Sequence, residues 1–325
     1  MKVFRLIISA MAMAIFVAST VSLAQDFPSK PLRFVTDIAA GGGGDVILRV
    51  LSPHISSAIG QPVFVENRPG GGGIVAAEFV ARAAPDGYTC LAASQNPLII
   101  RPYLVKKQSL NVFKDLTAIT LLWQATTVVL SNGALPVTSL AELIEYAKAN
   151  PGKLSYGSSG FGSSHHFTGE ELQQLTRTKM VHIPYTGGIG AIKAVMTGEV
   201  QVAIGLAQSA VPIIRSSKVR VLALVQGKRF SSMPDVPYVS AIVPGFEPPP
   251  SWVGLFTAAG LPSDILRRLH SDVAKALSSP KLRFQSVDEG YELIANAPEE
   301  FTAQLRSEFN LIGRISKSAG IQPAD

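Results

Sequence analysis

The chain has 325 residues, of which 47% are apolar and 16% charged, with 29 basic against 23 acidic side chains. The mild positive excess is spread along the chain instead of forming basic runs, which argues against nucleic-acid binding and leaves room for the capture of a small anion. Cys90 is the only cysteine, so an internal disulfide is excluded.

The first 24 residues are expected to be an export signal. Lys2 and Arg5 precede an apolar run, residues 6–21, that ends in the small-residue site Ser22-Leu23-Ala24. The run is shorter than the roughly 20 residues that a membrane-spanning helix needs, so an anchor is the weaker interpretation. We therefore expect cleavage after Ala24 and a periplasmic location. The remaining chain is longer than one hydrophobic core comfortably allows, which predicts two lobes.

Strand and helix patterns alternate over the first hundred residues. The sequence predicts strands at 30–38, 63–66 and 88–93, and helices at 45–58 and 74–83. This β-α-β-α-β order requires a mostly parallel sheet, and ligands bind such sheets beyond the carboxyl ends of the strands. Ser94, Gln95 and Asn96 follow the third strand at such an end, so their position makes them candidate ligand contacts.

The segment VTDIAAGGGGD, residues 35–45, is the most informative stretch. A strand runs into four glycines, and a helix restarts at Asp45, so bare backbone N–H groups face an anion without side chains in the way. The candidate contacts here are Ile38, Ala39, Ala40, Gly41, Gly42, Gly43 and Asp45. A carboxylate is awkward beside an anion, so Asp45 is expected to bond to free N–H groups and orient the loop from behind.

A second unit with the same alternation follows. It predicts strands at 126–130, 154–157, 181–184, 200–204 and 219–225, and helices at 140–150, 164–177 and 189–197. A strand at 252–257 and helices at 263–277 and 298–319 close the chain. One lobe is complete by about Trp123, yet the C-terminal segment still needs a sheet to cover. We therefore predict lobe 1 at 27–125 plus 251–325 and lobe 2 at 126–250, with two crossing strands forming a hinge.

The segment LSYGSSGFGSSHHFTGE, residues 154–170, repeats the strand-to-helix junction in the second unit. Serine hydroxyls and helix N-terminal amides can both donate to a carboxylate. The candidate contacts are Ser158, Ser159 and Gly160, with Ser163 and His166 at the helix start. His165 is expected to face solvent or to lie at the rim. Two anion-facing turns on two lobes suggest a clamp.

Several segments resemble the extracytoplasmic solute receptors of tripartite tricarboxylate transporters, the Bug or TctC-like family. These segments include FPSKPLRFV at 27–35, GQPVFVENRPGGGG at 60–73, ARAAPDGYT at 81–89 and HIPYTGG at 182–188. The resemblance implies a type II-like periplasmic-binding-protein fold, in which two α/β lobes with mostly parallel sheets are joined by two crossing strands. It adds Tyr185, Thr186 and Gly187 as a further loop that borders the cleft.

The resemblance also implies a function. Family members close over a small organic or aromatic carboxylate, which backbone amides and ordered water hold, without catalysis, metal or cofactor. They deliver the solute to the membrane subunits of a transporter, and some are thought to present it to a sensor kinase instead. The chain alone does not separate these two roles. We expect a monomer.

Three positions depart from the family pattern. Asp37-Ile38-Ala39-Ala40 replaces an apolar, proline-rich entry to the first loop, and Gly44 replaces a small hydroxyl residue. Gly205, a candidate contact from its position, stands where many members carry an acid suited to a ligand amino group. Its absence argues against an amino-acid ligand. Asp37 argues the other way if it faces the pocket, because its carboxylate would repel a second carboxylate on the ligand. The sequence leaves the direction of this side chain open.

An enzyme is the main rival interpretation, and the sequence offers little support for it. The glycine runs complete neither a P-loop nor a G-x-G-x-x-G pattern, and GSSGFG at 157–162 is not the G-x-S-x-G elbow of hydrolases. His166 and Glu170 lie one helical turn apart and could recruit a metal, but no third ligand is spaced nearby.

Overall fold

The computed structural model describes residues 27–214, 216–225, 233–249, 251–280, 282 and 290–324. The predicted export signal, residues 1–24, lies outside the described residues. Within the described part of the chain, no helix is both long and apolar enough to cross a membrane.

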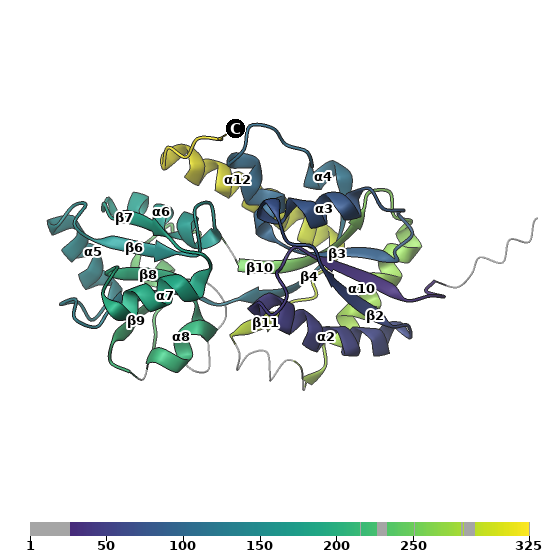
Figure 1. Ribbon diagram of the computed structural model, residues 1–325, viewed down its shortest axis with the longest axis horizontal. Helices are drawn as coiled ribbons and strands as arrows, with labels where there is room; N and C mark the ends of the chain where they lie inside the picture. The colour runs from purple at the N-terminus through teal and green to yellow at the C-terminus, as the bar shows by residue number, and fades with distance from the viewer. Residues whose placement is uncertain are drawn as a thin grey trace, which may run out of the picture.

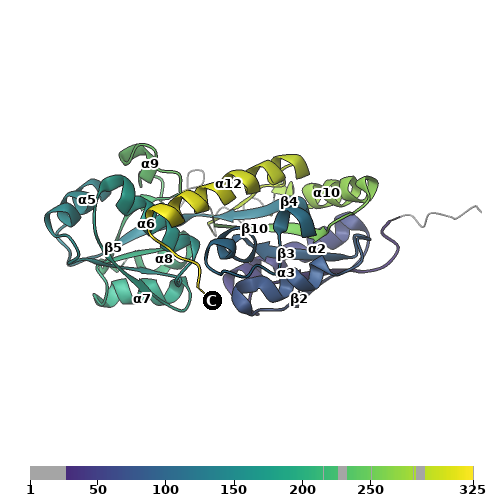
Figure 2. The ribbon, with the colours of Figure 1, turned by 90° about the horizontal axis from the view of Figure 1, so that it is seen from above.

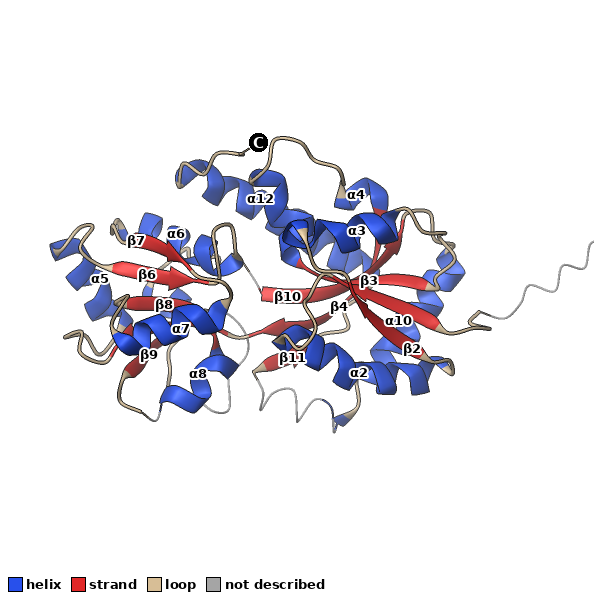
Figure 3. Cartoon of the chain, viewed as in Figure 1, coloured by secondary structure: helices blue, strands red, loops and turns tan. Residues whose placement is uncertain are grey.

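The described strands form two sheets that lie side by side in separate lobes, each with helices packed around it (Figure 1, Figure 3). The six-stranded sheet has the order β11-β4-β10-β3-β1-β2, and the five-stranded sheet has the order β7-β6-β8-β5-β9. The first sheet contains β1 (Leu32–Thr36), β2 (Val63–Asn67), β3 (Thr89–Ser94), β4 (Leu116–Ala125), β10 (Ser251–Ala258) and β11 (Tyr291–Leu293). The second contains β5 (Thr127–Asn132), β6 (Ser155–Ser158), β7 (Val181–Pro184), β8 (Val202–Leu206) and β9 (Val219–Leu224).

The helices of the first lobe are α2 (Gly43–Ile59), α3 (Ile74–Ala81), α4 (Val112–Asp115), α10 (Ser263–Leu277) and α12 (Pro298–Ser318). Those of the second are α5 (Leu140–Ala149), α6 (Ser164–Thr176), α7 (Gly188–Thr197), α8 (Ala207–Ile214) and α9 (Val239–Ile242). A π-helical turn, η2 (Asn96–Ile100), follows β3, and short 3₁₀ turns occupy η1 (Gly71–Gly73) and η3 (Arg101–Tyr103).

The predicted two-lobed α/β fold is confirmed, but the sheets are mixed instead of mostly parallel. β1 is parallel to β2 and β3, and β6 is parallel to β7 and β8. β10 is antiparallel to both β3 and β4, and β5 is antiparallel to both β8 and β9. The reason is the hinge. β4 continues into β5 with only Thr126 between them, and β10 brings the chain back beside β4 in the opposite direction.

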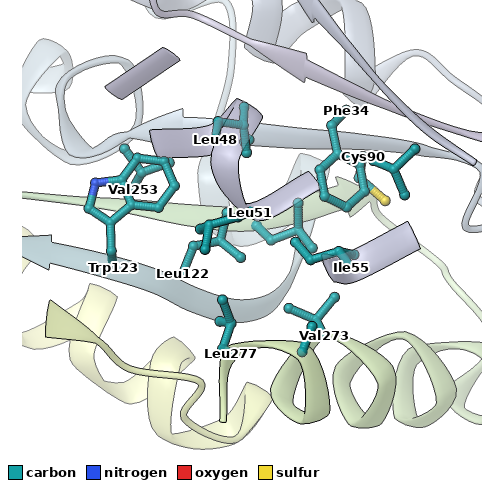
Figure 4. Close-up of a cluster of buried hydrophobic side chains, with 14 of the residues drawn as sticks. Phe34, Leu48, Leu51, Ile55, Cys90, Leu122, Trp123, Val253, Val273 and Leu277 are labelled. Carbon is teal, nitrogen blue, oxygen red and sulfur yellow. The ribbon is translucent and has the colours of Figure 1, made fainter. Parts of the chain in front are cut away.

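The first lobe fixes α2 firmly against its sheet. The buried face of α2 carries Leu48, Leu51 and Ile55, which lie against the sheet residue Phe34 and against α10 (Figure 4). Full burial of each such side chain is worth about 1.5–3 kcal/mol. The helix begins at Gly43, two residues before the predicted start at Asp45, so its N-terminus lies inside the glycine run.

Helix α12 links the two lobes. It packs on β4 of the first sheet and also contacts α6 of the second lobe (Figure 2). Near its C-terminal end, Arg314 Nη2 lies 2.8 Å from Glu247 Oε2, and Ser318 Oγ donates to Gln174 Oε1 at 2.5 Å. The last helix therefore packs on the first sheet and reaches past it to the other lobe.

Candidate ligand-binding cleft

A cavity of about 450 Å³ opens between the two lobes. Its walls come from the loops after β1 and β3 in the first sheet and after β6, β7 and β8 in the second. β1 and β3 are parallel to each other, as are β6, β7 and β8, so the carboxyl ends of two parallel strand sets converge on one space. This is the place where open α/β sheets bind ligands, and the volume suits a small organic molecule.

Asp45 holds the first-lobe loop from behind. Its buried carboxylate accepts hydrogen bonds from Gly41 N at 2.9 Å, Arg49 Nε at 3.0 Å and Asn67 Nδ2 at 2.7 Å. Burial opposes ionisation, but the bonds from Arg49, Asn67 and Gly41 outweigh it, and the pKa of Asp45 is lowered. Asp45 thus bonds to a free N–H group of the loop, as predicted, and does not line the cavity.

Asp37 faces away from the cavity. Its carboxylate accepts hydrogen bonds from Ser94 N at 3.0 Å and from Ser94 Oγ at 2.7 Å. Burial raises the pKa of Asp37, although the bonds from Ser94 oppose this. A Cβ added to Gly73 would come within 2.8 Å of Asp37 Oδ2, so the space beside it is closed. Asp37 does not line the cavity, and its effect on the site passes through Ser94, which does.

Two stacked histidines support the second-lobe loop, and each is hydrogen-bonded to a residue of that loop. The rings of His166 and His182 stack with centroids 4.0 Å apart, and Ser158 Oγ lies 2.7 Å from His182 Nε2. Gly162 N donates to His166 Nδ1 at 3.1 Å, and His166 N donates to the N-cap hydroxyl of Ser163 at 3.2 Å. Burial, together with the neighbouring His182, lowers the pKa of His166 to about 3. The pair is therefore neutral near pH 7 and fixes the loop without adding charge.

His165 is a buried part of the cavity wall, which corrects the expectation that it faces solvent or lies at the rim. Its side chain is 5% exposed, and its Nδ1 lies 2.9 Å from Ser159 Oγ. Burial lowers the pKa of His165 to about 4, so the ring is neutral near pH 7. The prediction was wrong because the start of α7 covers this side chain: a Cβ on Gly188, the first residue of α7, would lie 3.8 Å from His165 Cε1.

The two lobes touch at one side of the cavity. Gln208 Nε2, at the start of α8, donates to the hydroxyl of Tyr291 on β11, and we call this contact the interlobe bridge. Gly43 lies against it, because a Cβ there would be 3.0 Å from Gln208 Nε2 and 3.1 Å from Tyr291 Oη. A Cβ at this position would push these two groups by a few tenths of an ångström, so Gly43 leaves room for the interlobe bridge.

Four helices begin at the cavity. The residues at the starts of α2, α6, α7 and α8 line it, and the N-caps of α2 and α7 are glycines with no side-chain capping bond. Helix N-termini carry positive partial charge and unpaired N–H groups. Among the described residues, no Asp, Glu, Lys or Arg lines the cavity. Its electrostatic character therefore comes from backbone and helix dipoles, which favour an anion.

The cavity is lined by nine of the residues proposed from the sequence, which are Ile38, Gly43, Ser94, Gln95, Asn96, Ser159, Ser163, Thr186 and Gly187. The others lie beside or behind it, namely Ala39, Ala40, Gly41, Gly42, Asp45, Ser158, Gly160, His166, Tyr185 and Gly205. Tyr185 turns its hydroxyl to Glu199 at 2.7 Å. Gly205 lies within β8, where a Cβ would meet Ile192 Cδ1 at 3.1 Å, so this position faces α7.

Two groups of lining residues were not predicted. The hinge strands β4, β10 and β11 supply one, which includes Trp123, Trp252 and Tyr291, and the start of α8 supplies Gln208 and Ser209. The junction after β8 resembles the other strand-to-helix junctions and could have been found by the same rule. The pairing of β4 with β10 joins segments more than a hundred residues apart, and no local pattern shows it.

The geometry gives no support to metal chemistry. His166 Nε2 and Glu170 Oε1 are 3.7 Å apart, and in the described part of the chain no group of three His, Cys, Asp or Glu side chains could hold a metal ion. Tyr156 donates to the same Glu170 oxygen at 2.5 Å, so this carboxylate is already engaged in the protein.

Comparison with known proteins identifies relatives over nearly the whole chain. A family model described as a tripartite tricarboxylate transporter family receptor matches residues 47–321. A UPF0065 protein of Bordetella pertussis is 32% identical over 323 residues, which is 99% of this chain and 100% of the relative. The R. palustris protein Rpa4515, solved with adipate, is 27% identical with a TM-score of 0.80, covering 92% of this chain and 100% of that one. MatC from Rhodopseudomonas palustris, solved with bound malate, is 28% identical with a TM-score of 0.73, covering 90% and 100%.

Proposed function

This chain belongs to the tripartite tricarboxylate transporter receptor family, and we propose that it captures a small carboxylate between its lobes and delivers it to the membrane subunits of such a transporter. It is a solute-binding receptor of the periplasmic type. In our proposal, the export signal is cleaved after Ala24, and residues 27–125 with 251–325 form one lobe and residues 126–250 the other.

The observation that carries the proposal is the convergence of four helix N-termini on a cavity whose described lining residues include no charged side chain. A carboxylate placed there meets N–H donors from α2 on one lobe and from α6, α7 and α8 on the other. Hydrogen bonds to an ionised acceptor are the stronger kind, and helix dipoles add favourable potential. An acid would thus be bound by the backbone, with Ser159, Ser163 and Thr186 as side-chain donors.

The names of two relatives point the same way. Rpa4515 was solved with adipate and MatC with malate, and both ligands are carboxylates. The present cavity, at about 450 Å³, is large enough for acids of this size. We therefore propose an organic or aromatic acid as the solute.

A thermal-shift screen of the mature protein tests this proposal. The protein is unfolded and refolded first to remove co-purified ligand, and is then screened against mono-, di- and tricarboxylates, aromatic acids and amino acids. A ligand at 100 times its Kd stabilises by about 2.7 kcal/mol, so at least one acid should give a clear rise in melting temperature. If refolded protein with native circular dichroism responds to no acid, the proposed function is wrong.

A further inference from the structure

The cavity contains two buried polar atoms that lack a partner. His165 Nε2, from α6 of the second lobe, and Asn96 Oδ1, at the start of η2 in the first lobe, have no hydrogen-bond partner among the described residues. Both residues line the cavity. A buried polar atom left unpaired costs about 1–3 kcal/mol, and native structures retain such atoms where something else completes them. Both atoms belong to side chains of the cavity wall, one from each lobe.

A neutral imidazole restricts what that ligand can carry. The contact between Nδ1 and Ser159 Oγ leaves His165 Nε2 as a donor in one tautomer and as an acceptor in the other. A hydroxyl group fits both cases because it can donate and accept. When Nε2 is the donor, the hydroxyl accepts from it and its own proton remains for an acceptor such as Asn96 Oδ1. An uncharged hydroxyl would therefore satisfy His165 Nε2 in either tautomer.

An ammonium group fits this cavity poorly. No carboxylate lines it within the described part of the chain, since Asp37 and Asp45 are bonded on its outer side. The four helix N-termini give the space a positive potential, which disfavours a cation. Desolvation of a charge without a partner costs several kcal/mol, so an amino acid would lose binding free energy relative to the matching hydroxy acid.

We propose that the cavity selects acids whose second polar group is uncharged, a hydroxy acid before its amino-acid counterpart, and that His165 is the side chain that contacts this group. The inference rests on the proposed carboxylate-binding function. It adds a role for a residue that was expected to face solvent or to lie at the rim, and it specifies the ligand class by the second polar group that the acid carries.

Two matched ligand series test the selectivity. Succinate, malate and aspartate differ by hydrogen, hydroxyl and ammonium on one carbon, and 3-phenylpropionate, 3-phenyllactate and phenylalanine repeat the comparison on an aromatic skeleton. Calorimetric titration of refolded protein should give an amino congener about tenfold or more weaker than the hydroxy congener in whichever series binds, because one unpaired charge costs at least 1.4 kcal/mol. An amino acid that binds as tightly as its hydroxy counterpart overturns the inference and leaves the proposed function intact.

Two variants test the role of His165. The amide of Gln reaches the position of Nε2, whereas the shorter amide of Asn reaches only that of Nδ1. We expect His165→Asn to reduce the preference for the hydroxy over the unsubstituted acid by about fivefold or more, and His165→Gln to restore most of it. Urea midpoints without ligand establish that both variants fold. Equal preferences in the wild type and both variants remove His165 from the site. If no acid in either series or in the wider screen binds, the proposed function and this inference both fail.

Discussion

Replacing Asp45 with asparagine, a side chain of nearly the same size, should destabilise the protein strongly. The change keeps the shape of the side chain but removes its charge, and it puts an NH₂ group where one oxygen accepts hydrogen bonds. Gly41 N, Arg49 Nε and Asn67 Nδ2 all donate to this carboxylate. At least one of these donors would lose its acceptor in Asp45→Asn, in a setting where the side chain is 3% exposed.

The expected loss follows from these contacts. A hydrogen bond to a charged group contributes about 1.5–3 kcal/mol, and an unpaired buried donor costs a similar amount. The pair with Arg49 adds little because the arginine side chain is 50% exposed and solvent screens it. One acceptor oxygen remains in asparagine. Together these terms give a loss of about 2–4 kcal/mol in the free energy of unfolding near pH 7.

Urea unfolding followed by circular dichroism measures this loss, with Glu78→Gln as the matched control. Glu78 Oε2 pairs with Arg82 at the same i,i+4 spacing, at 3.2 Å, but with 77% of the arginine exposed, so its loss should cost under about 1 kcal/mol. The pKa of Asp45 is lowered in the folded state, so its contribution is present above the unfolded pKa near 4 and is lost as pH falls below it. The difference between wild type and Asp45→Asn should therefore shrink between pH 5 and pH 3. Equal effects of the two substitutions, or a difference that does not change with pH, would refute this reasoning.

Three further predictions concern the cleft and its surroundings. Gly43→Ala should weaken ligand binding about tenfold in calorimetry, because the added Cβ would separate the interlobe bridge. Gly41→Ala is the control: no atom lies within 4 Å of the added Cβ, but φ is +76°. It should cost about 1 kcal/mol of stability with little change in affinity. The pKa of His165 is lowered to about 4 in the folded state, so on acidification the unfolded state takes up the proton first. Between pH 7 and pH 5 this residue should lower the free energy of unfolding by about 2 kcal/mol. His165→Gln should therefore flatten the pH dependence of the urea midpoint, and His270→Gln should not. Burial raises the pKa of Glu171 to about 7, so its ionisation opposes folding, and Glu171→Gln should raise the melting temperature more at pH 8 than at pH 5.

The sequence predicted those features that local chemistry determines. The two-lobed α/β fold follows from the alternation of strands and helices, and the cavity lies where strand ends run into glycine and serine. Asp45 bonds to Gly41 N because it is four residues further along and lies in the first turn of a helix. A short-range pattern is sufficient for each of these predictions.

Long-range contacts explain what the sequence did not predict. The mixed sheets depend on β10 lying between β3 and β4, a pairing set by the hinge. The burial of His165 depends on the start of α7 at Gly188, and the environment of Gly205 depends on Ile192 of the same helix. The direction of Asp37 depends on Ser94, 57 residues away. In each case a residue acquired its environment from another element, and its own neighbours in sequence gave no sign of it.

The absence of charged side chains around the described cavity has a consequence for how affinity arises. Since no lysine or arginine among the described residues lines the cavity, the anion of the proposed function would be held by many weak donors on two lobes at once. Those donors meet a single ligand only while the interlobe bridge and the α12–α6 contact keep the lobes close. Affinity should then follow the population of the closed form, because binding to a minor competent state is weakened in proportion to its fraction. Substitutions at the bridge should change affinity for all acids together, whereas substitutions of His165 should change the preference among them.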